Sequence, residues 1–230
     1  MTLGETLRRH QLVRPSAEGW RQAIDQHDDA GARQSLLHWS AHDLPVVVCT
    51  QGSGGLQGGC VALGLPTPPD WGRQRIRLSI DPAQLRCEVA EFPRWESCRE
   101  ALPLSHAARA LLDRALDADA GDSRVYGSFG WQQLTGLQYV NSGSDIDLLL
   151  EPRDPAHADR LASALFEADT GRPRLDGELC FHSGSDIAWR EWLQWRAGRV
   201  DGVVVKRLHG PVLVNDAARL TETRAAVSTS

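Results

Sequence analysis

The chain has 230 residues, a net charge of −5 at pH 7 and an isoelectric point near 5.9. This length is enough for one large domain or two small ones with a substantial hydrophobic core. The acidic balance argues against a nucleic-acid polymerase, which would need a basic track for phosphates, so we expect small or protein-borne substrates. The five cysteines include no C-x-x-C pair and therefore indicate neither a disulfide framework nor a zinc site.

The first ten residues contain no apolar signal-peptide core, and no stretch approaches the ~18 apolar residues of a membrane span. We therefore expect a cytoplasmic protein with no membrane partner. At the other end, residues 223–230 are small and polar, which is typical of a disordered tail.

The first third of the chain is predicted to form a small α/β domain of its own, over residues 1–82. Its periodicity predicts helices at 20–27 and 32–39 and strands at 44–49, 60–65 and 75–80. Residues 51–59 are rich in glycine but lack the Lys-Ser/Thr pair and the helix that follow a phosphate-binding loop. This segment is therefore predicted to be a hairpin loop.

A second domain is predicted over residues 83–230, after a linker region around Pro82, Pro93 and Pro103. Ser105 is expected to cap a helix that continues to about Asp117. Strands follow at 124–126, 145–150, 175–181, 203–205 and 212–214, and helices at about 129–135, 155–168 and 186–197. This order predicts a mixed sheet with helices packed against it, an α/β (α+β) fold.

Two carboxylates are the most informative feature of the second domain. Asp145 and Asp147 flank Ile146 at the start of an apolar run, Leu148-Leu149-Leu150, which reads as a buried strand. Side chains on a strand alternate between faces, so both acids project from the same side. Their mutual repulsion would be relieved by a divalent cation, and carboxylate oxygens are the ligands that Mg²⁺ prefers. The alternative is that Asp-x-Asp is only a turn or cap pair.

Gly127 and Ser128 close the preceding strand and supply the second half of the predicted site. Glycine lets the backbone approach a ligand closely, and a helix that starts at this point would direct its free amides at an anion. The pair is therefore predicted to bind the phosphates of a triphosphate. The simpler interpretation is a plain strand-to-helix turn.

A third acid is expected on a neighbouring strand. Asp176 is our first choice and Glu178, on the same strand face, is the reserve candidate. Lys206 is a further candidate for contact with a triphosphate, although lysine is also common on edge strands.

Two patterns near residue 190 are interpreted as structural. Ser183-Gly184-Ser185-Asp186-Ile187 repeats the sequence that contains Asp145 but lacks a second acid, so Ser185 is predicted to be a helix N-cap and Asp186 a first-turn acid. Trp189, Trp192 and Trp195 share one helix face and are expected to pack in the core, with adenine stacking as the minor alternative.

Together these residues resemble the malonate decarboxylase holo-acyl-carrier-protein synthases, a family of phosphoribosyl-dephospho-CoA transferases with a nucleotidyltransferase-like catalytic domain. The resemblance covers nearly the whole chain. Its clearest segments are Val61-Ala62-Leu63-Gly64-Leu65-Pro66, Val125-Tyr126-Gly127-Ser128, Ser144-Asp145-Ile146-Asp147-Leu148-Leu149, Asp176-Gly177-Glu178 and Ala188-Trp189-Arg190-Glu191. The interval between Ser128 and Asp145 is longer than in most nucleotidyltransferases, and residues 137–141 within it have no assigned role.

The resemblance implies transfer of a prosthetic group from triphosphoribosyl-dephospho-CoA to a serine of the apo acyl carrier subunit of malonate decarboxylase, with release of pyrophosphate. Our hypothesis for the mechanism is that Asp145 and Asp147 hold Mg²⁺, while Asp176 binds a second ion or accepts the proton of the serine. Gly127 and Ser128 would bind the departing pyrophosphate. The alternatives are a nucleotidyltransferase that uses an NTP on another protein or small molecule, and a non-catalytic binding module.

Overall fold

The computed structural model describes residues 7–52, 59–86, 90–117 and 123–220. The contacts divide the chain into two compact units. Unit 1 consists of Met1–Phe92, Gln132–Tyr139 and Arg207–Gly210, and unit 2 of Pro93–Trp131, Val140–Lys206 and Pro211–Ser230. Two short segments from the second half of the chain thus belong to unit 1. The predicted hairpin loop and the predicted disordered tail lie largely outside the described residues.

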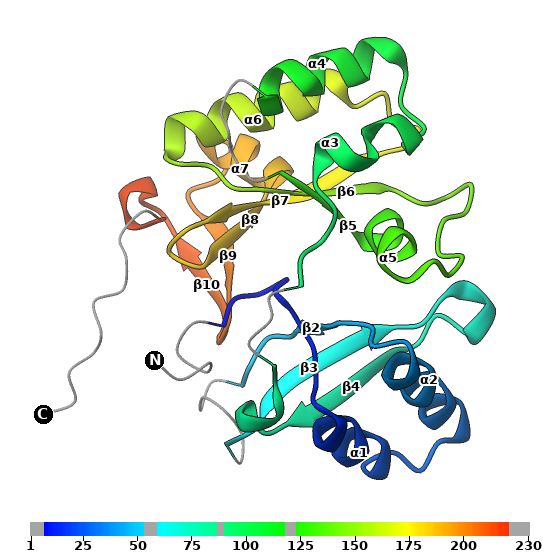
Figure 1. The fold of residues 1–230 in the computed structure, drawn as a ribbon. Helices are drawn as coiled ribbons and strands as arrows, with labels where there is room; N and C mark the ends of the chain where they lie inside the picture. The colour runs from blue at the N-terminus through cyan, green and yellow to red at the C-terminus, as the bar shows by residue number, and fades with distance from the viewer. Residues whose placement is uncertain (1–6, 53–58, 87–89, 118–122, 221–230) are drawn as a thin grey trace, which may run out of the picture. The chain divides into compact units, whose positions relative to one another are not determined.

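Unit 1 contains a four-stranded antiparallel sheet with the strand order β1-β2-β3-β4, and two helices that pack against each other (Figure 1). Its elements are β1 (Leu12–Val13), α1 (Ala17–Asp25), α2 (Ala30–Ala41), β2 (Val46–Val48), β3 (Val61–Pro66), the 3₁₀ turn η3 (Pro69–Trp71), β4 (Arg75–Ile80) and the 3₁₀ turn η4 (Pro82–Gln84). The helices begin where side-chain oxygens cap them: Ser16 accepts from the Gly19 amide and Asp29 from the Ala32 amide.

β4 shows the strand period most clearly. Ile76, Leu78 and Ile80 are buried and alternate with exposed residues, so one face of the strand enters the core. The predicted bounds of this strand are confirmed. β1 is too short for a sequence pattern and was not predicted.

Unit 2 contains a six-stranded mixed sheet with the strand order β10-β9-β8-β7-β6-β5. β6 and β7 are parallel neighbours joined by α6, whereas β5–β6, β7–β8 and β8–β9 pair antiparallel. The elements in this part of the chain are α3 (Trp95–Cys98), η5 (Arg99–Ala101), α4 (His106–Asp117), β5 (Arg124–Tyr126), α5 (Gly127–Thr135), β6 (Ile146–Leu150), α6 (Pro155–Ala168), β7 (Leu175–Phe181), β8 (Ser185–Ala188), α7 (Trp189–Arg196), β9 (Val203–Arg207), β10 (Gly210–Val214) and η6 (Ala217–Leu220). The end of α5, from Gln132, and the terminal residues Arg207 of β9 and Gly210 of β10 belong to unit 1. The predicted α+β class is confirmed.

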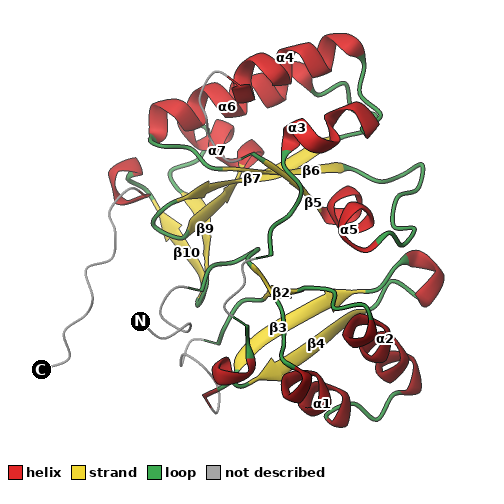
Figure 2. Ribbon diagram, viewed as in Figure 1, coloured by secondary structure: helices red, strands yellow, loops and turns green. Residues whose placement is uncertain are grey.

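The hydrophobic core of unit 2 lies between the sheet and helices α4, α6 and α7, which form one layer over it (Figure 2). On β6, Ile146, Leu148 and Leu150 are fully buried in this core. The alternate residues of the strands, including Asp147, face the other side of the sheet. The helix layer thus gives the central strands one apolar face and leaves a second face for polar groups.

The tryptophans of α7 contribute to this core, as predicted. Trp189 and Trp192 are fully buried, and Trp195 is partly buried against them. The Trp192 indole nitrogen donates to Asp159 on α6 at 2.9 Å, which ties the two helices together.

The predicted helix over 186–197 is wrong in its first turn. Ser185 and Asp186 lie in β8, which pairs antiparallel with β7, and the helix begins only at Trp189. Gly184 has φ +76 and closes the hairpin between the two strands, and the buried Ile187 anchors β8 in the core. This tertiary pairing overrides the local cap pattern. Ser185 is therefore not an N-cap, and Asp186 faces the same side of the sheet as its partner Cys180.

Two smaller expectations are also corrected. The expected linker region contains a short helix, α3, whose Trp95 is fully buried. Lys206 does not lie on an edge strand, because β9 is flanked by β8 and β10.

Within the described ranges no helix is both long enough and apolar enough to cross a lipid bilayer.

Candidate functional site

Gly127 and Asp147 meet where β5 ends and α5 begins. Tyr126, the last residue of β5, is the antiparallel partner of Asp147 on β6. Gly127 follows with φ +59, and a Cβ atom at this position would lie 1.8 Å from the Asp147 Oδ2 atom. The backbone conformation and the close carboxylate both require glycine here. The strand-to-helix turn is therefore built around Asp147.

The third acid of the sequence-based hypothesis lies beside the other two. Asp176 on β7 is the parallel partner of Asp147 on β6, and both project from the face of the sheet opposite the helix layer. Gly177 allows the two strands to come together, because a Cβ on it would lie 2.2 Å from the Leu148 carbonyl oxygen. Asp145 precedes β6 on the same face. The amino-terminal ends of two parallel strands thus bring three carboxylates to one edge.

Arg174 lies between two of these acids. Its Nη2 atom donates to Asp145 Oδ2 at 2.6 Å and to Asp176 Oδ2 at 2.8 Å, and its Nε atom donates to Asp145 Oδ2 at 3.1 Å. The Arg174 carbonyl accepts from the Ile146 amide at 2.9 Å, which fixes the arginine next to the start of β6. One guanidinium therefore neutralises part of the charge of the cluster.

The Asp147 carboxyl has a strongly raised pKa. Its pKa is raised from 3.8 to about 6, first by burial and then by the negative charges of Asp176 and Asp145, against the opposing charge of Arg174. Burial and the nearby negative charges, first that of Glu178, also raise the pKa of the Tyr126 hydroxyl, which stays neutral at physiological pH. This edge of the sheet is strongly negative and favours a cation.

The donor set fits a hard divalent cation such as Mg²⁺. It offers carboxylate oxygens from Asp145, Asp147 and Asp176, and burial together with the neighbouring acids raises the pKa of Asp147. The oxygens of these three acids, all of which the structure describes, do not lie within 4.8 Å of one another. Arg174 occupies the space between two of them.

The remaining predicted site residues are Ser128, Lys206 and the alternative acid Glu178. Ser128 follows Gly127 in the first turn of α5, where the backbone amides lack helical partners. Lys206 on β9 donates to Glu178 on β7 at 2.6 Å, on the same face of the sheet as Asp176. This ion pair thus occupies Glu178, the alternative candidate for the third acid. It also occupies Lys206, the predicted phosphate contact, whose side chain is 40% exposed.

Arg174 and Tyr126 were missed in the sequence analysis. A signal for Arg174 was present, because it precedes Asp176 by two residues and so shares its strand face. Tyr126 gives no such signal, since only the pairing of β5 with β6 places it opposite Asp147.

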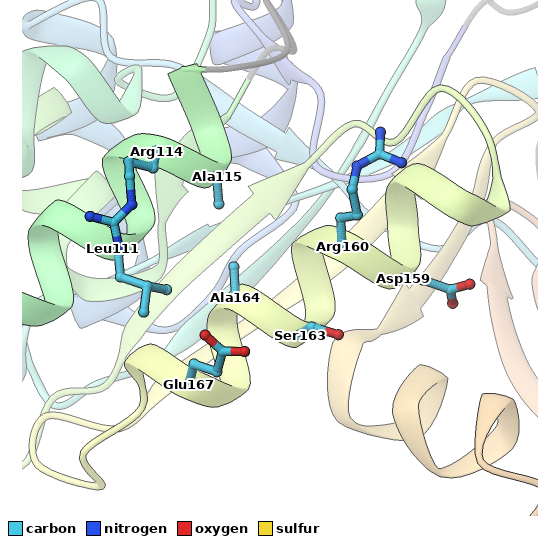
Figure 3. Close-up of a pocket in the computed structure, with 8 residues that line it drawn as sticks. All are labelled: Leu111, Arg114, Ala115, Asp159, Arg160, Ser163, Ala164 and Glu167. Carbon is cyan, nitrogen blue, oxygen red and sulfur yellow. The ribbon is translucent and has the colours of Figure 1, made fainter.

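A surface pocket of unit 2 lies elsewhere, along α4 and α6 (Figure 3). Its lining residues are Leu111, Arg114, Ala115, Asp159, Arg160, Ser163, Ala164 and Glu167. These residues belong to the helix layer, on the opposite side of the sheet from the three acids. The pocket is therefore separate from the acidic site.

Comparison with known proteins identifies both parts of the chain. Residues 93–217 match the model of the phosphoribosyl-dephospho-CoA transferase MdcG C-terminal domain, and residues 8–90 match that of the MdcG N-terminal domain. A phosphoribosyl-dephospho-CoA transferase of Xanthomonas campestris pv. campestris is 36% identical over 220 residues, which cover 95% of this chain and 99% of the relative. One of Bradyrhizobium diazoefficiens is 37% identical over 189 residues, which cover 80% of each chain.

No solved structure matches the chain. The two family models cover the described ranges almost completely, and the Xanthomonas relative matches at nearly full length. On this evidence the chain belongs to the phosphoribosyl-dephospho-CoA transferase family, and it is a transferase.

Proposed function

We propose that the protein transfers phosphoribosyl-dephospho-CoA from triphosphoribosyl-dephospho-CoA to a serine of the apo acyl carrier subunit of malonate decarboxylase, releasing pyrophosphate. The observation that carries the proposal is the convergence of Asp145, Asp147 and Asp176 beside the Gly127 turn, in a chain of this transferase family. The reaction displaces pyrophosphate from a triphosphate, and its main catalytic demands are positioning and charge neutralisation.

Asp145, Asp147 and Asp176 are the residues that would hold Mg²⁺. The ion, when bound, supplies positive charge to the triphosphate and stabilises the charge that develops on the attacking and leaving oxygens. Asp147 would be the most enclosed of these three ligands, because it packs against the backbone at Gly127. Asp145 and Asp176 have side chains that are about one-third exposed, at 35% and 33%, and so face the incoming substrates.

The proposed step forms a bond between the carrier serine oxygen and the phosphorus atom of the donor, and breaks the bond from that phosphorus to pyrophosphate. The proton of the hydroxyl passes to the Asp176 carboxylate, which is exposed enough to meet a protein acceptor. The pyrophosphate leaves with its negative charge next to the first turn of α5, where Gly127 and Ser128 present backbone amides.

The choice of a coenzyme A-derived donor over an NTP rests on the family, since both would use the same acids. The test measures pyrophosphate release with each donor, in the presence of Mg²⁺ and the apo carrier subunit. We expect turnover with triphosphoribosyl-dephospho-CoA and little with ATP. Turnover with ATP and transfer of AMP to the product would instead support a general nucleotidyltransferase.

The same assay tests the acids. Asp145→Asn and Asp147→Asn should each abolish pyrophosphate release at saturating Mg²⁺, because each removes a charged ligand without changing side-chain size. Asp201→Asn is the matched control, since Asp201 is exposed and lies outside the cluster. Wild-type turnover in either of the first two variants would contradict the metal assignment.

A further inference from the structure

Arg174 has the contacts of a bound cation. A single nitrogen, Nη2, bridges oxygens of Asp145 and Asp176, which come from the starts of two parallel strands. The same carboxylates are the residues that would hold a metal ion. The guanidinium and an ion therefore compete for one set of lone pairs.

The position of Arg174 suits reversible engagement. Its backbone is held beside β6 by the bond to the Ile146 amide, whereas its side chain is 48% exposed. Ion pairs of this exposure are individually weak, because water competes for both partners. The side chain can therefore leave the acids with its backbone in place.

The charges of the cluster favour such an exchange. With all three acids ionised the cluster carries three negative charges, of which Arg174 compensates one and a divalent ion would compensate two. A triphosphate brings several more negative charges to the same edge. A guanidinium released from the acids would then find phosphate oxygens within its reach, and guanidinium groups bind phosphate through paired hydrogen bonds.

We propose that Arg174 is the internal counterion of the acidic site, which a divalent metal displaces and which then binds the phosphates of the donor. This role rests on the proposed function, because it assumes that Asp145 and Asp176 bind a metal. It assigns Arg174 two opposite effects: it weakens binding of the metal alone and strengthens binding of the metal–phosphate complex.

Calorimetric titration of the full chain tests both effects, with Mn²⁺ alone and then with Mn²⁺ and inorganic pyrophosphate as probes. Arg174→Gln should bind Mn²⁺ roughly five- to thirtyfold more tightly than wild type, which corresponds to about 1 to 2 kcal/mol at 1.4 kcal/mol per factor of ten. In the presence of saturating Mn²⁺ it should bind pyrophosphate about tenfold more weakly. Arg174→Lys keeps the charge and should stay close to wild type for Mn²⁺.

The matched control is Arg172→Gln, an exposed arginine two residues earlier in the chain. It changes the net charge equally and should leave both affinities unchanged. An Arg174→Gln variant that binds Mn²⁺ no more tightly than wild type, or that binds pyrophosphate equally well, would overturn the counterion role.

The same titrations separate this inference from the proposed function. Asp145→Asn should lose Mn²⁺ affinity if the acids hold the metal. If it does so while Arg174→Gln has no effect, only the counterion role fails. If the wild type, Arg174→Gln and Asp145→Asn all bind Mn²⁺ equally or not at all, the metal site of the proposed function fails, and the counterion role fails with it. Binding that appears only in Arg174→Gln would support the competition.

Discussion

Neutralising Asp147 should stabilise the metal-free protein while it destroys activity. In the folded chain the pKa of the Asp147 carboxyl is about 6 instead of 3.8, chiefly because of burial and then because of Asp176 and Asp145. The charged form is thus disfavoured by folding. Asp147→Asn keeps the shape of the side chain and removes the charge.

The sign and size of the effect follow from proton linkage. Between pH 3.8 and 6 the folded protein binds more protons at Asp147 than the unfolded chain does, so this group lowers the unfolding free energy as pH rises through that window. The loss is complete above about pH 7 and amounts to at most about 3 kcal/mol, since one pKa unit corresponds to about 1.4 kcal/mol. Asp147→Asn should recover up to that amount at pH 8 and nothing near pH 4.

The assay is urea unfolding in EDTA, followed by tryptophan fluorescence, at a series of pH values from 4 to 8. The difference in unfolding free energy between Asp147→Asn and wild type should grow with pH and level off above about pH 7. Asp201→Asn, an exposed control, should show no such growth. A variant that is equally stable or less stable at pH 8, or a difference that does not depend on pH, would refute the electrostatic reasoning.

Three further substitutions test the geometry of the site. Asp176→Asn should lose most transfer activity but keep donor binding in calorimetry, and loss of donor affinity with an unchanged rate would contradict its role at the attacking oxygen. Gly127→Ala should lower the unfolding free energy by about 1–3 kcal/mol and abolish turnover, because the added methyl group would overlap the Asp147 carboxylate. Gly136→Ala is the control, since Gly136 also has positive φ but has open space around it. Lys206→Met should cost about 1–3 kcal/mol in urea unfolding, because it removes the ammonium group from the buried Glu178 carboxylate. Unchanged stability with weaker donor binding would instead give Lys206 a direct role at the phosphates.

The central strands of unit 2 could be predicted because local pattern and tertiary structure agree there. Leu148 and Leu150 enter the core, and the alternation of side chains along the strand places Asp145 on the same face as Asp147, so two of the three acids follow from a single strand. Asp176 required more. Its position opposite Asp147 depends on the parallel register of β6 and β7. The hydrophobic pattern of each strand does not determine how the two strands pair.

Other features could not be predicted because tertiary pairing decides them. Ser185 and Asp186 have good cap chemistry for a helix, yet the hairpin with β7 makes them a strand. The spacing of Arg174 from Asp176 places both residues on one strand face, but the contact of Arg174 with Asp145 depends on the pairing of β6 with β7. Residues 137–141 gave no interpretation, whereas the structure shows that Tyr139 donates its hydroxyl to the Pro66 carbonyl at 2.8 Å within unit 1.

The most direct test of the proposed function is the mass of the carrier subunit after incubation with the protein, Mg²⁺ and triphosphoribosyl-dephospho-CoA. We expect the intact carrier to gain the mass of one phosphoribosyl-dephospho-CoA group, and pyrophosphate to appear in equal amount. EDTA, or replacement of the acceptor serine by alanine, should leave the mass unchanged. A carrier that keeps its original mass under complete conditions, or one that gains the mass of AMP when ATP is the donor, would contradict the proposal.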